Sequence, residues 1–192
     1  MLSNDQFPKI TIKSADELRQ WLLAHHTQAG SVWLVTYKKA KPTWYVSTSE
    51  VLDELLCFGW MDGIRRKLDD DKTMQLIAPR KAKHWSKTYK DRAARLIENG
   101  RMQEAGHRSI AESKASGLWD FLDDVDQLIV PDDLKKALAQ KAGASDFFNA
   151  INPSSKRFAL RWLKLAKTQA TREKRLEKLA VLSASGEKLP GS

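Results

Sequence analysis

The first part of the chain alternates between hydrophobic residues at helical spacing and short runs of β-branched and aromatic residues. Two segments begin with serine and carry glutamate three residues later, Ser14-Ala15-Asp16-Glu17 and Ser47-Thr48-Ser49-Glu50. This pattern is a capping box, in which each of the two side chains bonds a free backbone amide at the start of a helix. Hydrophobic residues then recur every three or four positions, which predicts two amphipathic helices. Between the two helices, residues 31–38 (SVWLVTYK) predict a largely buried strand.

A β-hairpin is predicted after the second helix. Segments 64–68 and 73–78 flank Asp69-Asp70-Asp71, which is polar enough to form a solvated turn. Because side chains alternate across a strand, the pattern places Ile64 and Leu68 toward the core. Arg65 and Lys67 are then expected to face solvent, while Arg66 shares the face of Ile64 and Leu68.

Beyond the hairpin every predicted element is a helix. Residues 119–133 contain six aspartates and no basic residue, and we place a domain boundary there. The predicted helices span about residues 86–99, 102–116, 132–142, 145–151, 153–167 and 171–183. We therefore expect an α+β fold: a small sheet with packed helices at 1–118, an acidic linker at 119–133, and an all-helical basic C-terminal domain at 134–192.

The composition favours a cytoplasmic protein with an anionic partner. The chain has 33 lysines and arginines against 24 aspartates and glutamates, a formal net charge of +9. A basic surface attracts nucleic acid, nucleotides or acidic proteins, although it also serves solubility alone. No apolar run approaches the roughly 20 residues of a membrane span, and no signal peptide is visible at the start. The single cysteine, Cys57, excludes an internal disulfide, and we expect it to be a buried, inert thiol.

Several motifs carry a family resemblance. They are residues 56–67 (LCFGWMDGIRRK), Ala78-Pro79-Arg80-Lys81, Trp85-Ser86, residues 153–157 (PSSKR), Arg161-Trp162 and Thr171-Arg172. With these motifs the chain, over residues 14–186, resembles the bacterial bacteriocin-protection family, also called YdeI-like or OmpD-associated. The resemblance implies a role in tolerance of antibacterial agents. It implies no established reaction, cofactor or catalytic residue.

A first candidate site follows the predicted hairpin. Between Arg80 and Arg101 the chain carries eight basic and two acidic residues, interleaved with aromatic residues. A guanidinium pairs with phosphate while an indole stacks on a ring, so the pattern favours an anionic, ring-bearing ligand. The candidate ligand-binding residues are Trp60, Asp62, Arg65, Lys67, Arg80, Lys81 and Trp85. In the alternative interpretation, both tryptophans belong to the core and the cations only solvate the surface.

Asp62 is the one candidate catalytic residue, as a general base beside these cations. The alternative is a turn, since an Asp-Gly pair commonly adopts one. The four histidines show no metal-ligand spacing, and the chain has no glycine-rich phosphate loop or nucleophile elbow. We therefore expect no metal and no cofactor.

A second candidate site is the basic stretch from Pro153 to Lys178, which carries nine basic and two acidic residues. On a helical wheel its first helix separates an apolar arc from a basic one. The candidate polyanion-binding residues are Arg157, Arg161 and Lys164. The stripe is suited to nucleic acid, to anionic lipid or to an acidic protein partner, and equally to pairing with the acidic linker of its own chain.

These features favour a cytoplasmic binding protein for an anionic ligand, phosphate-bearing or polyanionic, in a family associated with bacteriocin or stress tolerance. One alternative is an enzyme that acts on a phosphorylated or carboxylated small metabolite, with Asp62 beside Arg65 and Arg80. The other is a protein-interaction module that uses the basic C-terminal helix. The lack of a recognisable catalytic constellation disfavours the enzyme.

Overall fold

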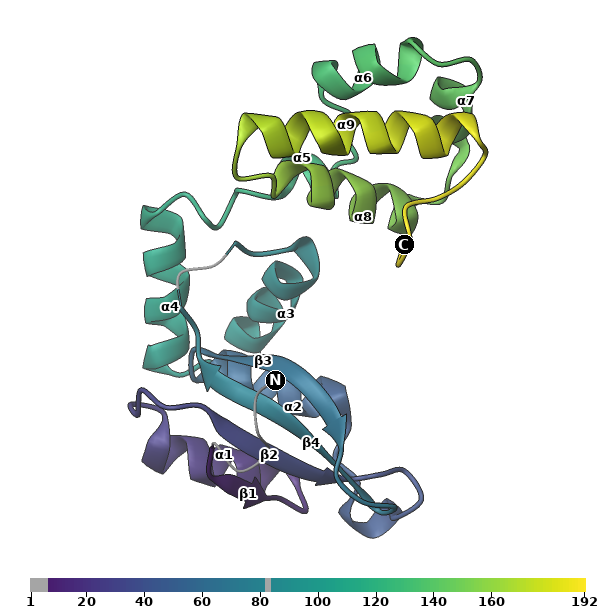
Figure 1. The fold of residues 1–192 in the computed structure, drawn as a ribbon. Coiled ribbons are helices and arrows are strands. Elements are labelled where there is room, and N and C mark those ends of the chain that lie inside the picture. Colours follow the sequence, from purple (N-terminus) through teal and green to yellow (C-terminus); the bar gives the residue numbers. More distant parts are fainter. Residues whose placement is uncertain (1–6, 82–83) are drawn as a thin grey trace. The chain divides into compact units, whose positions relative to one another are not determined.

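The computed structural model describes residues 7–81 and 84–192, which form two units with their boundary between Asp120 and Phe121 (Figure 1). The first unit is a four-stranded mixed sheet with helices, and the second contains only helices. The α+β fold class predicted from the sequence, with its all-helical C-terminal part, is therefore confirmed. Among the described residues, no helix is long and apolar enough to cross a bilayer.

The sheet of the first unit has the strand order β1-β2-β4-β3. Its strands are β1 (Lys9–Thr11), β2 (Val32–Tyr37), β3 (Trp60–Lys67) and β4 (Lys72–Pro79). β1 runs parallel to β2, and the two remaining pairings are antiparallel. The strand and the hairpin predicted from the sequence are confirmed. β1 is too short to leave a hydrophobic pattern, and it takes its hydrogen bonds from β2.

The helices of the first unit are α1 (Ala15–His25), the 3-10 helix η1 (Pro42–Trp44), α2 (Thr48–Cys57), α3 (Lys87–Glu98) and α4 (Glu104–Ala115). Of these, α1 and α2 begin directly after the predicted serine caps, Ser14 and Ser47. At α2 both bonds of the capping box form: Glu50 N donates to Ser47 Oγ at 3.2 Å, and Ser47 N donates to the Glu50 carboxylate at 2.8 Å. At α1, Glu17 N donates to Ser14 Oγ at 3.1 Å. These local bonds satisfy amides that no helical carbonyl reaches.

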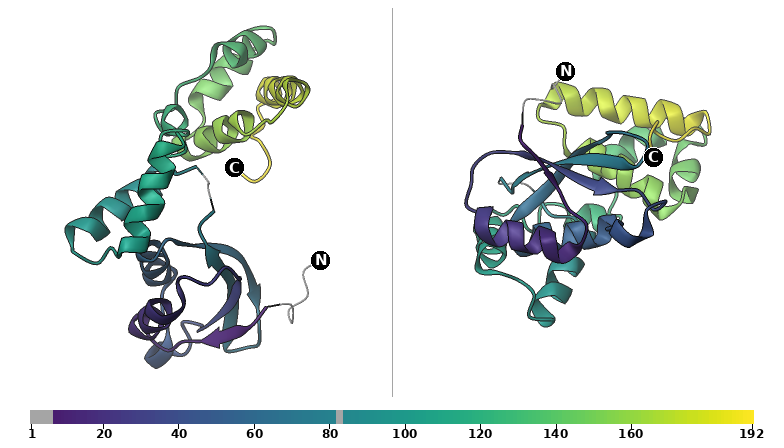
Figure 2. Two further views of the ribbon diagram at one scale, coloured as in Figure 1. Left: turned by 90° about the vertical axis from the view of Figure 1, so that its left-hand side faces the viewer. Right: turned by 90° about the horizontal axis from the view of Figure 1, so that it is seen from below.

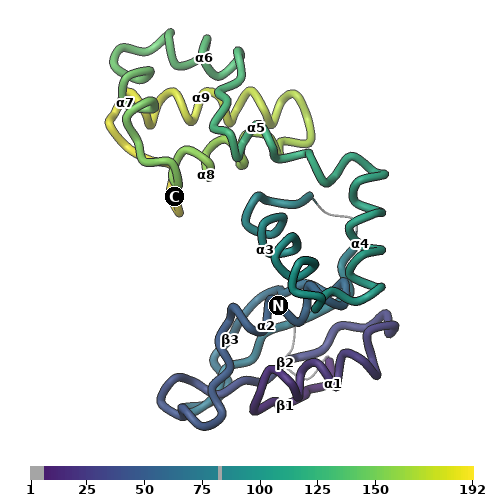
Figure 3. Tube along the Cα trace, turned by 180° about the vertical axis from the view of Figure 1, so that it is seen from behind, coloured from purple at the N-terminus to yellow at the C-terminus, as the bar shows by residue number. Residues whose placement is uncertain are grey.

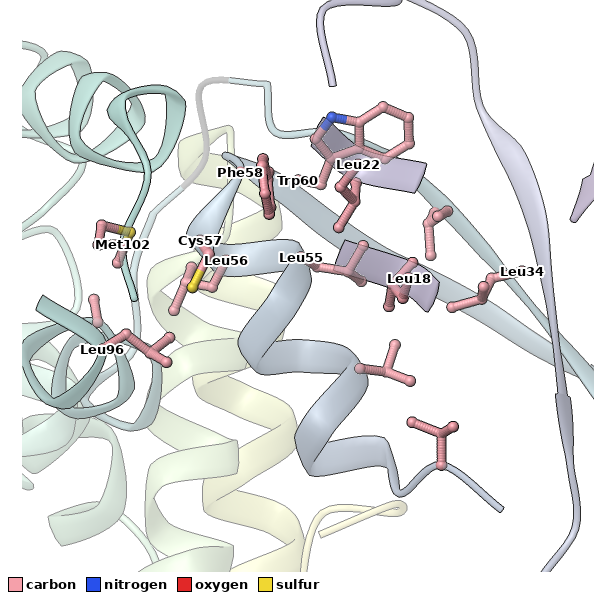
Figure 4. Packing of buried hydrophobic residues seen from close by; sticks show 14 of the residues in the cluster. Leu18, Leu22, Leu34, Leu55, Leu56, Cys57, Phe58, Trp60, Leu96 and Met102 are labelled. Carbon is pink, nitrogen blue, oxygen red and sulfur yellow. The ribbon is translucent and has the colours of Figure 1, made fainter. Parts of the chain in front are cut away.

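The main core lies between the sheet and the helices α1 and α2, which cover one face of the sheet (Figure 2). Leu18 and Leu22 of α1 and Leu55 of α2 pack there with Leu34 of β2 and with Trp60 (Figure 4). Both candidate tryptophans are core residues, because Trp60 and Trp85 are each 1% exposed. Cys57 is fully buried as predicted, and burial raises the pKa of its thiol. The opposite face carries a smaller cluster built on Trp33, Val35 and Met74.

The prediction that Ile64 and Leu68 face the core is wrong, since they are 46% and 37% exposed. The pairing register shifts between Asp62, which lies opposite Ile77, and Arg65, which lies opposite Gln75. One extra residue of β3 is inserted there, so a bulge inverts the alternation of faces. As a result Arg65 shares a face of the sheet with Asp62.

A charge network on α2 ties the helices of the first unit together. Glu54 is 1% exposed, and its carboxylate accepts hydrogen bonds from Arg19 of α1, at 2.9 Å, and from Arg101. The neighbouring Asp53 accepts from Arg92 and Arg95 of α3, from Arg95 at 2.7 and 2.8 Å. Because a buried carboxylate is costly unless it is paired, these contacts hold α1, α2 and α3 in one arrangement.

The second unit consists of helices packed around one hydrophobic cluster. Its helices are α5 (Asp123–Asp126), α6 (Asp132–Ala139), α7 (Ala144–Ala150), α8 (Pro153–Lys164) and α9 (Gln169–Ala184). α9 lies alongside α6, α7 and α8 (Figure 3). Asn152 caps α8, accepting from Ser155 N at 2.9 Å. Within the acidic segment, Leu122 and Val125 are buried in this cluster.

Because α2 and α4 approach closely at Gly106, we expect a substitution of this glycine to change the stability of the fold. A Cβ added at Gly106 would lie 2.5 Å from the carbonyl oxygen of Cys57 and 2.8 Å from that of Leu56, and would also collide with Met102. Alanine is favoured over glycine in a helix by ~1 kcal/mol. We nevertheless expect Gly106→Ala to lower the free energy of unfolding by about 1–3 kcal/mol, because backbone must move. Urea denaturation measures the change.

Gly30→Ala is the matched control, since nothing lies within 4 Å of the added Cβ. We expect its stability to equal or slightly exceed that of the wild type. Equal stability of the two variants would contradict the packing of α4 against α2.

Candidate anion-binding site

A chain of polar side chains crosses the helix-covered face of the sheet near the end of β4. Arg65 donates to Gln75 Oε1 at 2.7 Å, and Gln75 Nε2 donates to Asp62 Oδ2 at 3.0 Å. The hydroxyl of Tyr89, on α3, donates to Asp62 Oδ1 at 2.7 Å. Both carboxylate oxygens of Asp62 are therefore held by side-chain donors, which fixes the orientation of the carboxylate.

Burial and this hydrogen bond set the ionisation of Tyr89. Burial, followed by the hydrogen bond to Asp62 and the charge of Asp62, raises the pKa of Tyr89 to about 12. All three causes disfavour the negatively charged phenolate. Tyr89 thus stays protonated at neutral pH and acts as a donor to Asp62.

Arg80 lies directly after β4, beside this chain. Its guanidinium carbon is 4.0 Å from the ring centroid of Trp85 and 5.7 Å from that of Tyr89. One guanidinium nitrogen donates to His84 O at 3.3 Å, whereas the buried Nε has no hydrogen-bond partner among the described residues. Burial lowers the pKa of Arg80, and the charges of Tyr89 and Asp62 oppose that shift. Arg80 is thus a partly desolvated cation that aromatic rings hold in place.

Arg80 and Lys81 line a pocket of ≈ 240 Å³ against α4. The wall formed by α4 comprises Ser109, Glu112, Ser113 and Ser116. The hydroxyls of Ser113 and Ser116 donate to carbonyl oxygens of α4, at 2.8 and 2.9 Å, and keep their lone pairs as acceptors. The pocket therefore combines two cations, three hydroxyls and one carboxylate.

The structure brings together most, but not all, of the predicted ligand-binding residues. Asp62, Arg65, Arg80 and Trp85 lie in one set of contacts, and Lys81 lines the pocket. Trp60 is part of the core, where its Nε1 donates to His26 O at 3.0 Å. Lys67 lies at the far end of β3 and pairs with Asp70 of the turn at 2.7 Å.

The sequence pattern did not predict Tyr89, Gln75 or the wall of α4 as parts of the site. Tyr89 follows Trp85 by four residues, and Gln75 is a polar residue in an otherwise apolar strand, so both left a weak signal. The serines of α4 left none. They come near Arg80 only because Gly106 lets α4 pack closely on α2.

The predicted polyanion site on α8 is partly occupied by the acidic segment of the same unit. Lys164 Nζ lies 2.5 Å from Asp124 Oδ1, and Arg157 Nε donates to Asp126 O at 3.5 Å. Arg172 forms two bonds with Asp133, at 2.6 and 3.0 Å, which lower the pKa of that carboxyl. Pairing with its own chain, one of the alternatives left open by the sequence, thus accounts for Lys164. Arg157 and Arg161 are exposed.

Within residues 7–81 and 84–192, no three side chains of histidine, cysteine, aspartate or glutamate gather as a metal site would require.

The Tyr89 environment can be tested by titration. The absorbance of wild type minus that of Tyr89→Phe isolates one phenol, and we expect its midpoint at about 12. Circular dichroism of the same samples checks that the fold persists across the titration. A midpoint near the ordinary value of about 10 would contradict the buried contact with Asp62.

Comparison with known families divides the chain in the same way as its packing does. Residues 10–109 match a family model described as a domain of unknown function (DUF8412). Residues 127–186 match a model described as Bacteriocin-protection, YdeI or OmpD-Associated. Comparisons with the curated proteins and with the solved structures gave no match.

The resemblance predicted from the sequence is confirmed through the second unit, while the motif at residues 56–67 falls within the other match. The chain belongs to the DUF8412 family, whose model matches more than half of it, and its second unit carries a domain of the bacteriocin-protection, YdeI or OmpD-associated family.

Proposed function

We propose that the first unit binds a small anionic ligand in the Arg80 pocket. The observation that carries this proposal is a partly desolvated cation with no carboxylate at ion-pair distance among the described residues. Arg80 forms no ion pair with a carboxylate of the described residues, and its buried Nε lacks a hydrogen-bond partner there. An unpaired buried charge is costly, and an anion in the pocket offsets that cost.

The pocket suggests the chemistry of the ligand. Its ≈ 240 Å³ lies below the roughly 300–1,000 Å³ of typical ligand pockets, which favours a molecule of a few heavy atoms beyond its anionic group. Arg80 and Lys81 suit a phosphate or a carboxylate. The serines and Glu112 suit hydroxyl groups on the same molecule. A phosphorylated or carboxylated polyol satisfies both requirements.

Trp85 supports Arg80 and does not offer a stacking surface to a ligand. It is 1% exposed, with the Arg80 guanidinium over its ring and the Trp119 ring centroid at 4.8 Å. A ligand ring has no open face of Trp85 on which to stack. Trp85 instead positions Arg80, so the ligand requires an anionic group but no aromatic ring.

Binding is favoured over catalysis by the state of Asp62. A general base needs a carboxylate oxygen within hydrogen-bond reach of a substrate proton. In this structure both oxygens of Asp62 already accept from Tyr89 and Gln75. Asp62 therefore supports the wall of the site rather than reacting with a ligand.

A thermal-shift assay tests the proposal with inorganic phosphate, sulfate, glycerol phosphate, a hexose phosphate and citrate. We expect at least one compound to raise the melting temperature by about 5 °C at concentrations far above its Kd, because a ligand that binds only the folded state stabilises it. Arg80→Ala and Lys81→Ala should abolish the shift. Lys81 is exposed, so its loss leaves folding intact.

Arg108→Ala is the matched control. It removes the same charge from an exposed position of α4 that does not line the pocket, and the shift should persist. If no compound stabilises the wild type, or if both pocket variants respond as the wild type does, the proposal fails.

A further inference from the structure

An aromatic surface with three neighbouring lysines is centred on the loop that follows β2. Trp44, the last residue of η1, is 40% exposed, and its ring centroid lies 5.0 Å from that of Tyr37. Three lysine ammonium groups lie near ring faces: Lys13 at 5.4 Å from Trp44, Lys72 at 5.3 Å from Tyr37, and Lys39 at 6.0 Å from Tyr45. These six residues are called the Trp44 surface below.

The turn between β3 and β4 contacts this loop, and its aspartates pair with some of the nearby lysines. Lys38 N donates to Asp71 O at 2.9 Å, so the loop and the turn lie side by side (Figure 1). Lys41 pairs with Asp71 at 3.3 Å, and Lys72 lies 4.0 Å from Asp69. Lys13 and Lys39 are exposed and form no ion pair with a carboxylate of the described residues.

We propose that the Trp44 surface binds single-stranded nucleic acid. An exposed indole offers a face on which an unpaired base stacks, and neighbouring ammonium groups pair with the flanking phosphates. Lys13 is close enough to the Trp44 ring to contact the phosphate of a nucleotide whose base stacks there. Bases of a duplex have both faces covered, so the same surface selects single strands.

Tryptophan and lysine also occur together at membrane surfaces. A flat anionic bilayer would meet the three aspartates of the adjoining turn, Asp69, Asp70 and Asp71, together with the lysines. A flexible single strand can follow the lysines past that turn. The arrangement of charge therefore favours the nucleic acid.

This proposal is independent of the proposed function, since the Trp44 surface shares no residue with the Arg80 pocket. The two ligands differ in size as well. Failure of either one leaves the other standing.

Fluorescence anisotropy of the full chain with a labelled oligothymidylate of about 12 nucleotides tests the proposal. We expect binding at low salt. The logarithm of the binding constant should fall linearly as the logarithm of the salt concentration rises, because each paired phosphate releases counterions. Trp44→Ala should weaken binding about ten-fold. Trp44→Phe should weaken it much less, because phenylalanine keeps an aromatic ring on which a base can stack. Lys39→Ala should reduce the salt slope by about 0.7.

Phe158→Ala and Lys188→Ala are the matched controls. Phe158 is also 40% exposed but lies on α8 of the second unit, and Lys188 is an exposed lysine of that unit. Both variants should bind as the wild type does. The proposal is overturned if the wild type does not bind, if Trp44→Ala binds equally well, or if only vesicles of anionic lipid are bound.

Discussion

The architecture of the first unit depends on a carboxylate that has been taken out of water. Glu54 on α2 is almost fully buried, and Arg19 and Arg101 approach it from α1 and from the segment before α4. Removing one partner of such a group leaves an uncompensated buried charge, which costs about 3–5 kcal/mol. Asp53 of α2 pairs with two arginines of α3 in the same way, so the carboxylates of α2 fix the positions of the neighbouring helices. The wall of the Arg80 pocket is a consequence of that packing.

Arg80 shows the opposite arrangement, and the contrast separates binding from architecture. Glu54, Asp133 and Lys164 each have a partner of opposite charge at hydrogen-bond distance. Arg80 is desolvated by aromatic rings yet has no such partner among the described residues. The net charge of +9 does not distinguish these cases. The distribution of partners does, because a paired charge has already made the interaction that a ligand would offer.

The two proposed surfaces lie on the unit that matches the domain of unknown function. The Trp44 surface lies within residues 10–109, as do Arg80 and Lys81. The match to the bacteriocin-protection family lies in the helical unit, where Lys164 and Arg172 pair with carboxylates of the same unit. Ligand recognition, as proposed, thus belongs to the first unit, whereas the name of the family belongs to the second.

The caps, the strand at 31–38, the hairpin and most of the helices could be predicted from the sequence, because these depend on signals a few residues apart, such as the Ser47–Glu50 box. The sequence also predicted Arg80, Lys81 and Asp62 as site residues, because cations interleaved with aromatic residues are typical of anion-binding sites. Which of these residues come into contact follows from the packing of the folded chain. The bulge in β3 moved Arg65 to the face of Asp62, burial turned Trp85 from a platform into a support, and the contact at Gly106 brought α4 to Arg80. Such meetings depend on strand register and helix packing between residues far apart in the chain, and no local pattern encodes either of these.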